Sequence, residues 1–179
     1  MADRTPEELL WSRVREVPDW PEAGVLFRDL TPMLADPHAF ATTVDLMAHA
    51  VGRGTVDEVV GIEARGFPQA AALAYHLGAG FVPLRKPGKL PGDVHVQEYD
   101  LEYGSTSLEL HQDALGPGRR AIIVDDVIAT GGTACAAIDL VRMTGAEVVG
   151  FMAILDLVAL GGADRIRERG VEVTALLSA

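Results

Sequence analysis

One stretch of the chain constrains the fold more than any other. Residues 121–133 read AIIVDDVIATGGT: an apolar strand, two acids, a loop of small residues and the start of a helix. A buried strand that passes through a glycine turn directly into a helix is typical of α/β proteins. The glycines allow a tight turn in which backbone N–H groups converge at the positive end of the helix dipole. The stretch therefore predicts a phosphate site at the carboxyl end of a buried strand.

The two acids narrow the ligand further. The loop is neither a Walker A motif nor a dinucleotide fingerprint, so the sequence lacks the main motifs that would indicate nucleotide hydrolysis or hydride transfer. Asp125 and Asp126 would repel a phosphate unless they bind other groups, and ribose hydroxyls are suitable partners. A phosphate loop beside a diol clamp describes a ribose 5-phosphate. The plainer alternative is an acidic turn followed by an ordinary helix cap.

Strands and helices alternate along most of the chain. Apolar runs predict strands at 58–62, 81–84, 121–124, 148–155 and 171–177, with helices at 67–77 and 133–143 between them. This alternation predicts a single α/β domain over residues 1–179, with a parallel sheet flanked by helices. Residues 85–107 carry too much glycine, proline and polar punctuation for a regular element and predict a long mobile loop or a hairpin, a type of segment that is often functional.

Two helices are predicted before the first core strand. Thr5-Pro-Glu-Glu8 is a capping box that opens a helix with Leu9, Leu10, Val14 and Val17 toward the core. Asp36-Pro37 opens a second helix, which Gly52 ends. The apolar trio 25–27 between these helices fits either a ligand contact or plain core packing.

The charge of the chain is strongly negative but unevenly distributed. Fifteen Lys and Arg residues against 26 Asp and Glu give a net charge of −11, which disfavours nucleic acid and anionic membranes as partners. Residues 64–92 hold no acid and contain four basic residues: Arg65, Arg85, Lys86 and Lys89. This positive segment supports a site for an anionic ligand, although a solvated surface is the commoner explanation for each basic residue alone.

Compartment and metal content follow from a few residues. A single cysteine, Cys135, cannot form an internal disulfide, and the first residues include no apolar signal segment, so we expect a cytoplasmic protein without a membrane span. The five histidines show no metal-ligand spacing. No metal held by protein side chains is expected.

The stretch 121–133 closely resembles the phosphoribosyl pyrophosphate (PRPP) motif of the type I phosphoribosyltransferases. Four further segments are similar to the adenine branch of this family and occur in the same order: GVLFRD (24–29), GIEARGF (61–67), VPLRKPGKLP (82–91) and YDLEYG (99–104). The resemblance covers roughly residues 5 to 177. It implies a Rossmann-like core with a small N-terminal hood, at about residues 1–35, and a flexible active-site loop, at about residues 85–107.

The resemblance also implies a reaction: adenine and PRPP would give AMP and pyrophosphate, with Mg²⁺ bound mainly through PRPP, in a homodimer. Arg65, Glu102 and Tyr103 would be catalytic, Glu102 by helping to move the N9 proton of the purine and Tyr103 by closing the loop. The implied PRPP and AMP contacts are Asp125, Asp126, Ala129, Thr130, Gly131, Gly132 and Thr133. The implied pyrophosphate contacts are Arg65, Arg85, Lys86 and Lys89. The implied adenine contacts are Leu26, Phe27, Arg28 and Val127.

Two other functions remain open at this point. A phosphoribosyltransferase for hypoxanthine, guanine or xanthine would share the PRPP segments. A PRPP-sensing regulator would be expected to add a basic DNA-binding module, and this acidic chain has none while it retains Glu102. The chain departs from the family at Pro68-Gln69-Ala70, where an aromatic residue and a glycine are usual, which leaves the shape of that helix start undecided.

Overall fold

A five-stranded parallel sheet forms the centre of the molecule in the computed structural model, which describes residues 4–100 and 105–179. The strand order is β4-β3-β7-β8-β9. The bounds are β3 (Glu58–Ile62), β4 (Gly80–Leu84), β7 (Arg120–Ile128), β8 (Glu147–Asp156) and β9 (Val173–Ser178). Every neighbouring pair in this sheet is parallel, which confirms the predicted α/β fold.

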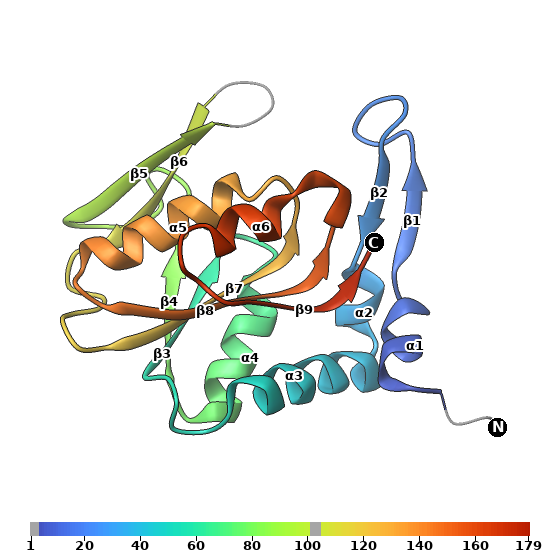
Figure 1. The fold of residues 1–179 in the computed structure, drawn as a ribbon, viewed down its shortest axis with the longest axis horizontal. Helices are drawn as coiled ribbons and strands as arrows, with labels where there is room; N and C mark the ends of the chain where they lie inside the picture. The colour runs from blue at the N-terminus through green and yellow to red at the C-terminus, as the bar shows by residue number, and fades with distance from the viewer. Residues whose placement is uncertain (1–3, 101–104) are drawn as a thin grey trace.

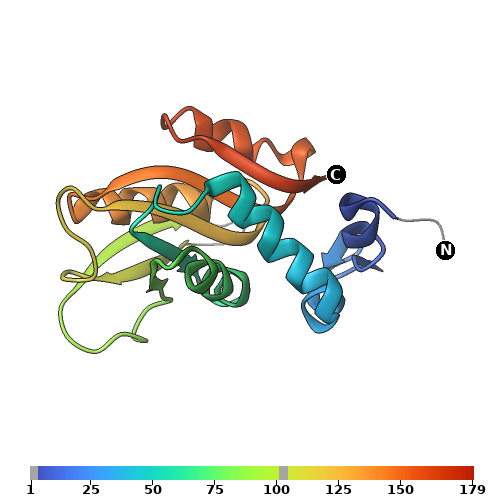
Figure 2. The same cartoon turned by 90° about the horizontal axis from the view of Figure 1, so that it is seen from below.

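Helices cover both faces of the sheet. Figure 1 shows α5 (Gly132–Met143) and α6 (Gly162–Arg167) above the sheet, and α3 (Pro37–Val51) and α4 (Phe67–Leu77) below it. Successive side chains of a strand point to opposite faces, so each strand feeds two cores. On β7, Ile123 packs in the cluster with α5 and α6, whereas Val124 packs in the cluster with α3 and α4. Figure 2 shows the same layers from below.

The N-terminal segment differs from the prediction in one respect. The capping box forms, with Thr5 and Glu8 bonding reciprocally, but α1 (Pro6–Trp11) ends before Val14. Val17 lies instead in β1 (Arg15–Pro18), opposite Phe27 in β2 (Leu26–Asp29). The prediction of one longer helix was wrong because cross-strand pairing outweighs a short apolar spacing that fits either element. A short α2 (Thr31–Ala35) then leads to α3.

Residues 94–111 contain the two strands of a second hairpin. Here β5 (Val94–Asp100) pairs antiparallel with β6 (Ser105–His111) and packs against α5. Figure 1 shows this hairpin at the opposite side of the molecule from the β1–β2 hairpin. For residues 85–107 the sequence predicted either a long mobile loop or a hairpin, and the structure has the hairpin. Glu102 and Tyr103 lie outside the described residues.

Ion pairs join β3 and β7 at their amino ends. The backbone amide of Arg120 donates to Asp57 Oδ2 at 2.9 Å, and the Arg120 guanidinium lies 3.0 Å from Asp57 Oδ1. These hydrogen bonds lower the pKa of Asp57 to about 2. Glu58 pairs with Arg119 beside them. The short turn η1 (Val158–Leu160) lies at the other end of the sheet.

None of the helices in the described part of the chain is long and apolar enough to span a bilayer.

Candidate active site

A cavity of about 450 Å³ lies at the carboxyl ends of β3 and β7, the edge at which parallel α/β sheets bind ligands. Six segments that are separate in the sequence contribute to it. Its walls are Val25, Leu26, Phe27, Arg28, Ile62, Glu63, Ala64, Arg65, Lys86, Tyr99, Asp125, Asp126, Val127, Ala129, Thr133 and Leu157.

The loop between β7 and α5 forms one end of this site. Residues 129–134 line a small adjoining hollow of about 70 Å³. Gly131 has φ +81°, a conformation that side chains with a Cβ rarely adopt, and it begins α5 without a side-chain cap. The unpaired amides of the first helical turn are therefore available to an anion. Thr130 and Thr133 add hydroxyl donors beside them.

Asp125 and Asp126 lie between this loop and the rest of the cavity. The Asp126 amide donates to Asp125 Oδ1 at 2.9 Å. Burial and the neighbouring Asp126 carboxylate raise the pKa of Asp125, and burial also raises the pKa of Asp126 against the opposing effect of Arg65. Among the described residues, Asp126 Oδ2 is buried without a hydrogen-bond partner. This oxygen is suited to accept a ligand hydroxyl.

Arg65 faces Asp126 from the turn after β3. Its Nη1 lies 3.6 Å from Asp126 Oδ2, and its guanidinium carbon lies 5.2 Å from the centre of the Phe27 ring. The turn can approach β7 closely because Gly66 has no side chain: a Cβ there would be 2.6 Å from Ile62 O and 2.8 Å from Val124 O. Arg65 thus connects the acid pair to the N-terminal hairpin while more than half of its side chain remains exposed.

Glu63 is a site residue for which the sequence analysis predicted no role. Its Oε2 accepts hydrogen bonds from the Lys86 amide at 2.8 Å and from Arg85 Nε at 2.9 Å. These donors lower the pKa of Glu63, so the carboxylate stays ionised at neutral pH. Glu63 therefore fixes the start of the positive segment to the turn that carries Arg65. The sequence offered two signals for it: Glu63 directly precedes the acid-free stretch, and it belongs to the GIEARGF segment.

The apolar trio of the N-terminal hairpin is not core. Val25 and Leu26 are exposed, Leu26 to 44%, and Phe27 is half-buried at the rim of the cavity. Trp20, which the sequence analysis did not single out, packs edge-on against Phe27 with ring centres 4.3 Å apart. Exposed apolar side chains gathered beside a polar site favour a ligand-binding role over plain packing.

The structure gathers most of the predicted site residues but not all of them. Arg65 and Lys86 line the main cavity, whereas Arg85 is paired with Glu63 and neither it nor Lys89 lines the cavity. Thr130, Gly131 and Gly132 line the adjoining hollow. The departure at residues 68–70 leaves α4 regular: it begins at Phe67, and Gln69 is fully buried.

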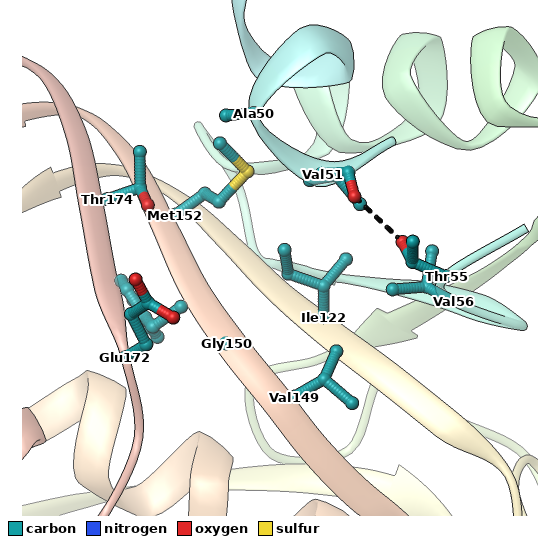
Figure 3. A pocket seen from close by; sticks show the side chains of 11 residues that line it. Ala50, Val51, Thr55, Val56, Ile122, Val149, Gly150, Met152, Glu172 and Thr174 are labelled. Carbon is teal, nitrogen blue, oxygen red and sulfur yellow. Dashed lines mark hydrogen bonds between the residues drawn. The ribbon is translucent and has the colours of Figure 1, made fainter. Parts of the chain in front are cut away.

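A different cavity of about 220 Å³ lies away from these residues. It is bordered by the end of α3 and by β7, β8 and β9, and contains none of the predicted site residues (Figure 3). At its edge, Thr55 Oγ1 donates to Val51 O at 2.9 Å (Figure 3). Most of the side chains that line it are aliphatic, and Glu172 lies at one side (Figure 3).

Comparison with known proteins identifies the family of this chain. Residues 34–173 match the model of the phosphoribosyl transferase domain family. The adenine phosphoribosyltransferase of Acidothermus cellulolyticus is 52% identical over 159 residues, which cover 89% of this chain and 90% of that protein. The crystal structure of adenine phosphoribosyltransferase from Rhodothermus marinus has a TM-score of 0.91 at 44% identity, covering 99% of this chain and 100% of that one. The Giardia lamblia enzyme, solved with 9-deazaadenine, has a TM-score of 0.92 at 32% identity and covers 99% of both chains. The chain belongs to the phosphoribosyltransferase family and, within it, to the adenine phosphoribosyltransferases.

Proposed function

We propose that this chain is a glycosyltransferase that moves the 5-phosphoribosyl group of PRPP to N9 of adenine, which yields AMP and pyrophosphate in purine salvage. One observation carries the proposal: a single cavity joins a phosphate loop, a buried acid pair and an apolar rim that includes Phe27. The phosphate loop suits a phosphate, the acid pair suits a ribose, and the apolar rim suits a purine.

The 5-phosphate would bind at the start of α5, through residues 129–133, where free amides and the helix dipole favour an anion. Asp125 and Asp126 would accept hydrogen bonds from the ribose hydroxyls. Asp126 Oδ2 supports this role: among the described residues it has the ion-pair contact with Arg65 but no hydrogen-bond partner, and a buried acceptor gains most from a ligand donor.

The pyrophosphate would leave toward Arg65 and Lys86, with Lys89 and Arg85 adding positive charge. The N9 lone pair attacks C1′ as the bond from C1′ to the pyrophosphate oxygen breaks, and N9 loses its proton. Charge builds on the leaving group, so fixed cations near it stabilise the transition state more than the ground state. Guanidinium and ammonium groups suit this task differently: Arg65 offers paired donors and Lys86 a point charge.

The purine would stack on Phe27 at the rim of the cavity. Main-chain groups of Leu26 and Arg28 would read its edge, and Val127 would line the opposite wall. Glu102 is proposed to help move the N9 proton and Tyr103 to close over the site. Both lie outside the described residues, so these two roles rest on the family resemblance alone.

Magnesium is proposed to enter with PRPP. Among residues 4–100 and 105–179, no group of three or more acidic, His or Cys side chains could hold a metal. Asp126 Oδ2, which has no hydrogen-bond partner among the described residues, suits a ligand hydroxyl or a metal-bound water. When bound, the ion would neutralise part of the pyrophosphate charge. A homodimer and a cytoplasmic location complete the proposal by analogy with the family.

A panel of purine bases tests the assignment. Purified protein is mixed with PRPP, Mg²⁺ and adenine, hypoxanthine, guanine or xanthine, and nucleotide formation is followed by chromatography. We expect AMP from adenine and little product from the other bases. Turnover of hypoxanthine but not adenine would refute the base assignment, and PRPP binding without turnover of any base would favour a regulator.

A further inference from the structure

The first residue of α6, Gly162, lies directly against the phosphate loop. A Cβ added at Gly162 would lie 2.2 Å from the carbonyl oxygen of Ala129 and 2.8 Å from the nitrogen of Gly131. It would also lie 2.8 Å from Ile128 Cγ2. The contact is mutual, because a Cβ at Gly131 would lie 2.8 Å from Gly162 O. Two backbone segments some 30 residues apart in sequence thus touch at a point where neither tolerates a side chain.

Space rather than backbone conformation excludes a side chain at Gly162. Its φ lies outside the left-handed range that disfavours other residues, unlike that of its neighbour Gly161 at +69°. At Gly161 the situation is reversed, since a Cβ there would meet no atom within 4 Å. The role of Gly162 is therefore to let the two backbones approach.

A second contact connects the same two segments. Arg165, in α6, donates from Nη1 to the carbonyl oxygen of Thr130 at 3.5 Å. Together the two contacts engage the carbonyl oxygens of Ala129 and Thr130. Gly162 also lies against the nitrogen of Gly131, but neither contact is a hydrogen bond from a loop N–H group, so the start of α6 supports the loop while these donors remain available to an anion.

We propose that Gly162 is a positioning residue for the 5-phosphate: its missing side chain lets the α6 turn hold the 129–131 loop in its phosphate-binding shape. The inference rests on the proposed function, which assigns the 5-phosphate to this loop. An alanine at 162 would force Ala129 O back by at least about 0.8 Å, the difference between 2.2 Å and the 3.0 Å below which such contacts do not occur. A shift of that size in a binding loop weakens a well-oriented interaction by about tenfold to a hundredfold.

The test compares two ligand fragments on Gly162→Ala. Ribose 5-phosphate uses the loop, whereas inorganic pyrophosphate would bind near Arg65 and Lys86, away from it. Calorimetry should show a loss of about tenfold to a hundredfold in ribose 5-phosphate affinity with pyrophosphate affinity unchanged. In steady-state kinetics, KM for PRPP should rise by a similar factor while kcat falls much less.

Two control variants separate positioning from a general loss of stability. Gly170→Ala places a Cβ in open space at φ +73°, just beyond the end of α6, so it strains the backbone without touching the loop. Gly116→Ala adds a Cβ in open space with no positive φ. Both control variants should keep wild-type affinity for ribose 5-phosphate. This holds for Gly170→Ala even if it lowers the melting temperature as much as Gly162→Ala does.

Several outcomes would overturn the proposal. A folded Gly162→Ala protein with wild-type ribose 5-phosphate affinity would do so, as would equal losses of affinity for both fragments. If Gly162→Ala does not fold, hydrogen exchange on the wild-type protein decides: ribose 5-phosphate must protect residues 158–166 along with 128–134. Protection of 128–134 alone would contradict the support role. Wild-type protein that neither binds ribose 5-phosphate nor consumes PRPP would instead refute the proposed function, before any variant is compared.

Discussion

Replacing Asp126 by asparagine should make the protein more stable and less able to bind PRPP. The Asp126 carboxylate is near enough to raise the pKa of Asp125. As a general scale, two like charges about 4–6 Å apart repel by roughly 3–4 kcal/mol at an effective dielectric constant of about 20. Asparagine removes this repulsion from Asp125, and its amide can donate to the Asp125 carboxylate. The contact with Arg65 is lost, but Arg65 is mostly exposed, so this costs at most about 1 kcal/mol. A net gain of about 1–3 kcal/mol remains after partial protonation of the wild-type pair.

Thermal unfolding without ligand measures this gain. For a domain of this size each kcal/mol raises Tm by roughly 2–4 °C, so a gain of about 1–3 kcal/mol should make Asp126→Asn melt roughly 2–12 °C above wild type at pH 7. Burial raises the pKa of Asp126, so the native wild type takes up a proton more readily than the unfolded chain as pH falls toward 4. The wild type regains stability in this range, and the difference in Tm should shrink.

Binding should change in the opposite direction. Loss of a charged acceptor for a ribose hydroxyl costs about 1.5–3 kcal/mol, so KM for PRPP should rise roughly tenfold or more. Asp156→Asn is the matched control: Asp156 is also buried with an unpartnered oxygen and a pKa raised by burial, but it does not line the cavity. It should gain stability and keep normal turnover. A lower Tm for Asp126→Asn, or unchanged PRPP affinity, would refute the reasoning.

Three further substitutions test other parts of the structure. Phe27→Leu should raise KM for adenine by up to about tenfold with little change in KM for PRPP, because only the purine loses an aromatic face; initial rates at varied adenine check this. Gly66→Ala should destabilise the fold by about 1–3 kcal/mol in urea unfolding and weaken product inhibition by pyrophosphate, because its Cβ meets backbone oxygens of β3 and β7. Asp57→Asn should lower stability at pH 7, and its unfolding free energy should vary less between pH 4 and pH 2. Arg120 lowers the pKa of Asp57 to about 2, so the stabilisation in the wild type is present above pH 4 and lost as pH falls through that range. Wild-type behaviour in any of the three would contradict the corresponding contact.

The sequence predicted the core of this fold because its signals there are local. The run from β7 through Gly131 into α5 carries strand, turn and helix signals in consecutive residues, and each agrees with the others. The same holds for α3, which begins after Asp36 and ends at Gly52 as predicted. The helix prediction was wrong at Val14 and Val17 because a spacing of three or four residues between apolar side chains fits a helix. The structure places Val17 in β1, where its pairing depends on Phe27, ten positions away, and Val14 lies between α1 and β1.

The site was harder to predict than the fold because its contacts join distant segments. The sequence grouped four basic residues by their spacing, but it could not show that Glu63 binds Arg85 and leaves Arg65 and Lys86 at the cavity. Nor could it show that Gly162 touches the phosphate loop, since a lone glycine pair predicts only a turn. Such pairings become visible only when the topology brings the segments together.

The ion pairs at the amino ends of β3 and β7 lie at the opposite edge of the sheet from the site. Asp57, Glu58, Arg119 and Arg120 connect the strands there, while the carboxyl ends of the same strands carry the ligand-binding turns. Charges that secure the scaffold and charges that meet the substrate are thus separated by the length of the strands. Substitutions among the ion pairs at the amino ends can therefore change the thermal stability of the chain without touching the residues that bind the substrate. Adaptation to a new growth temperature need not alter the enzyme's chemistry.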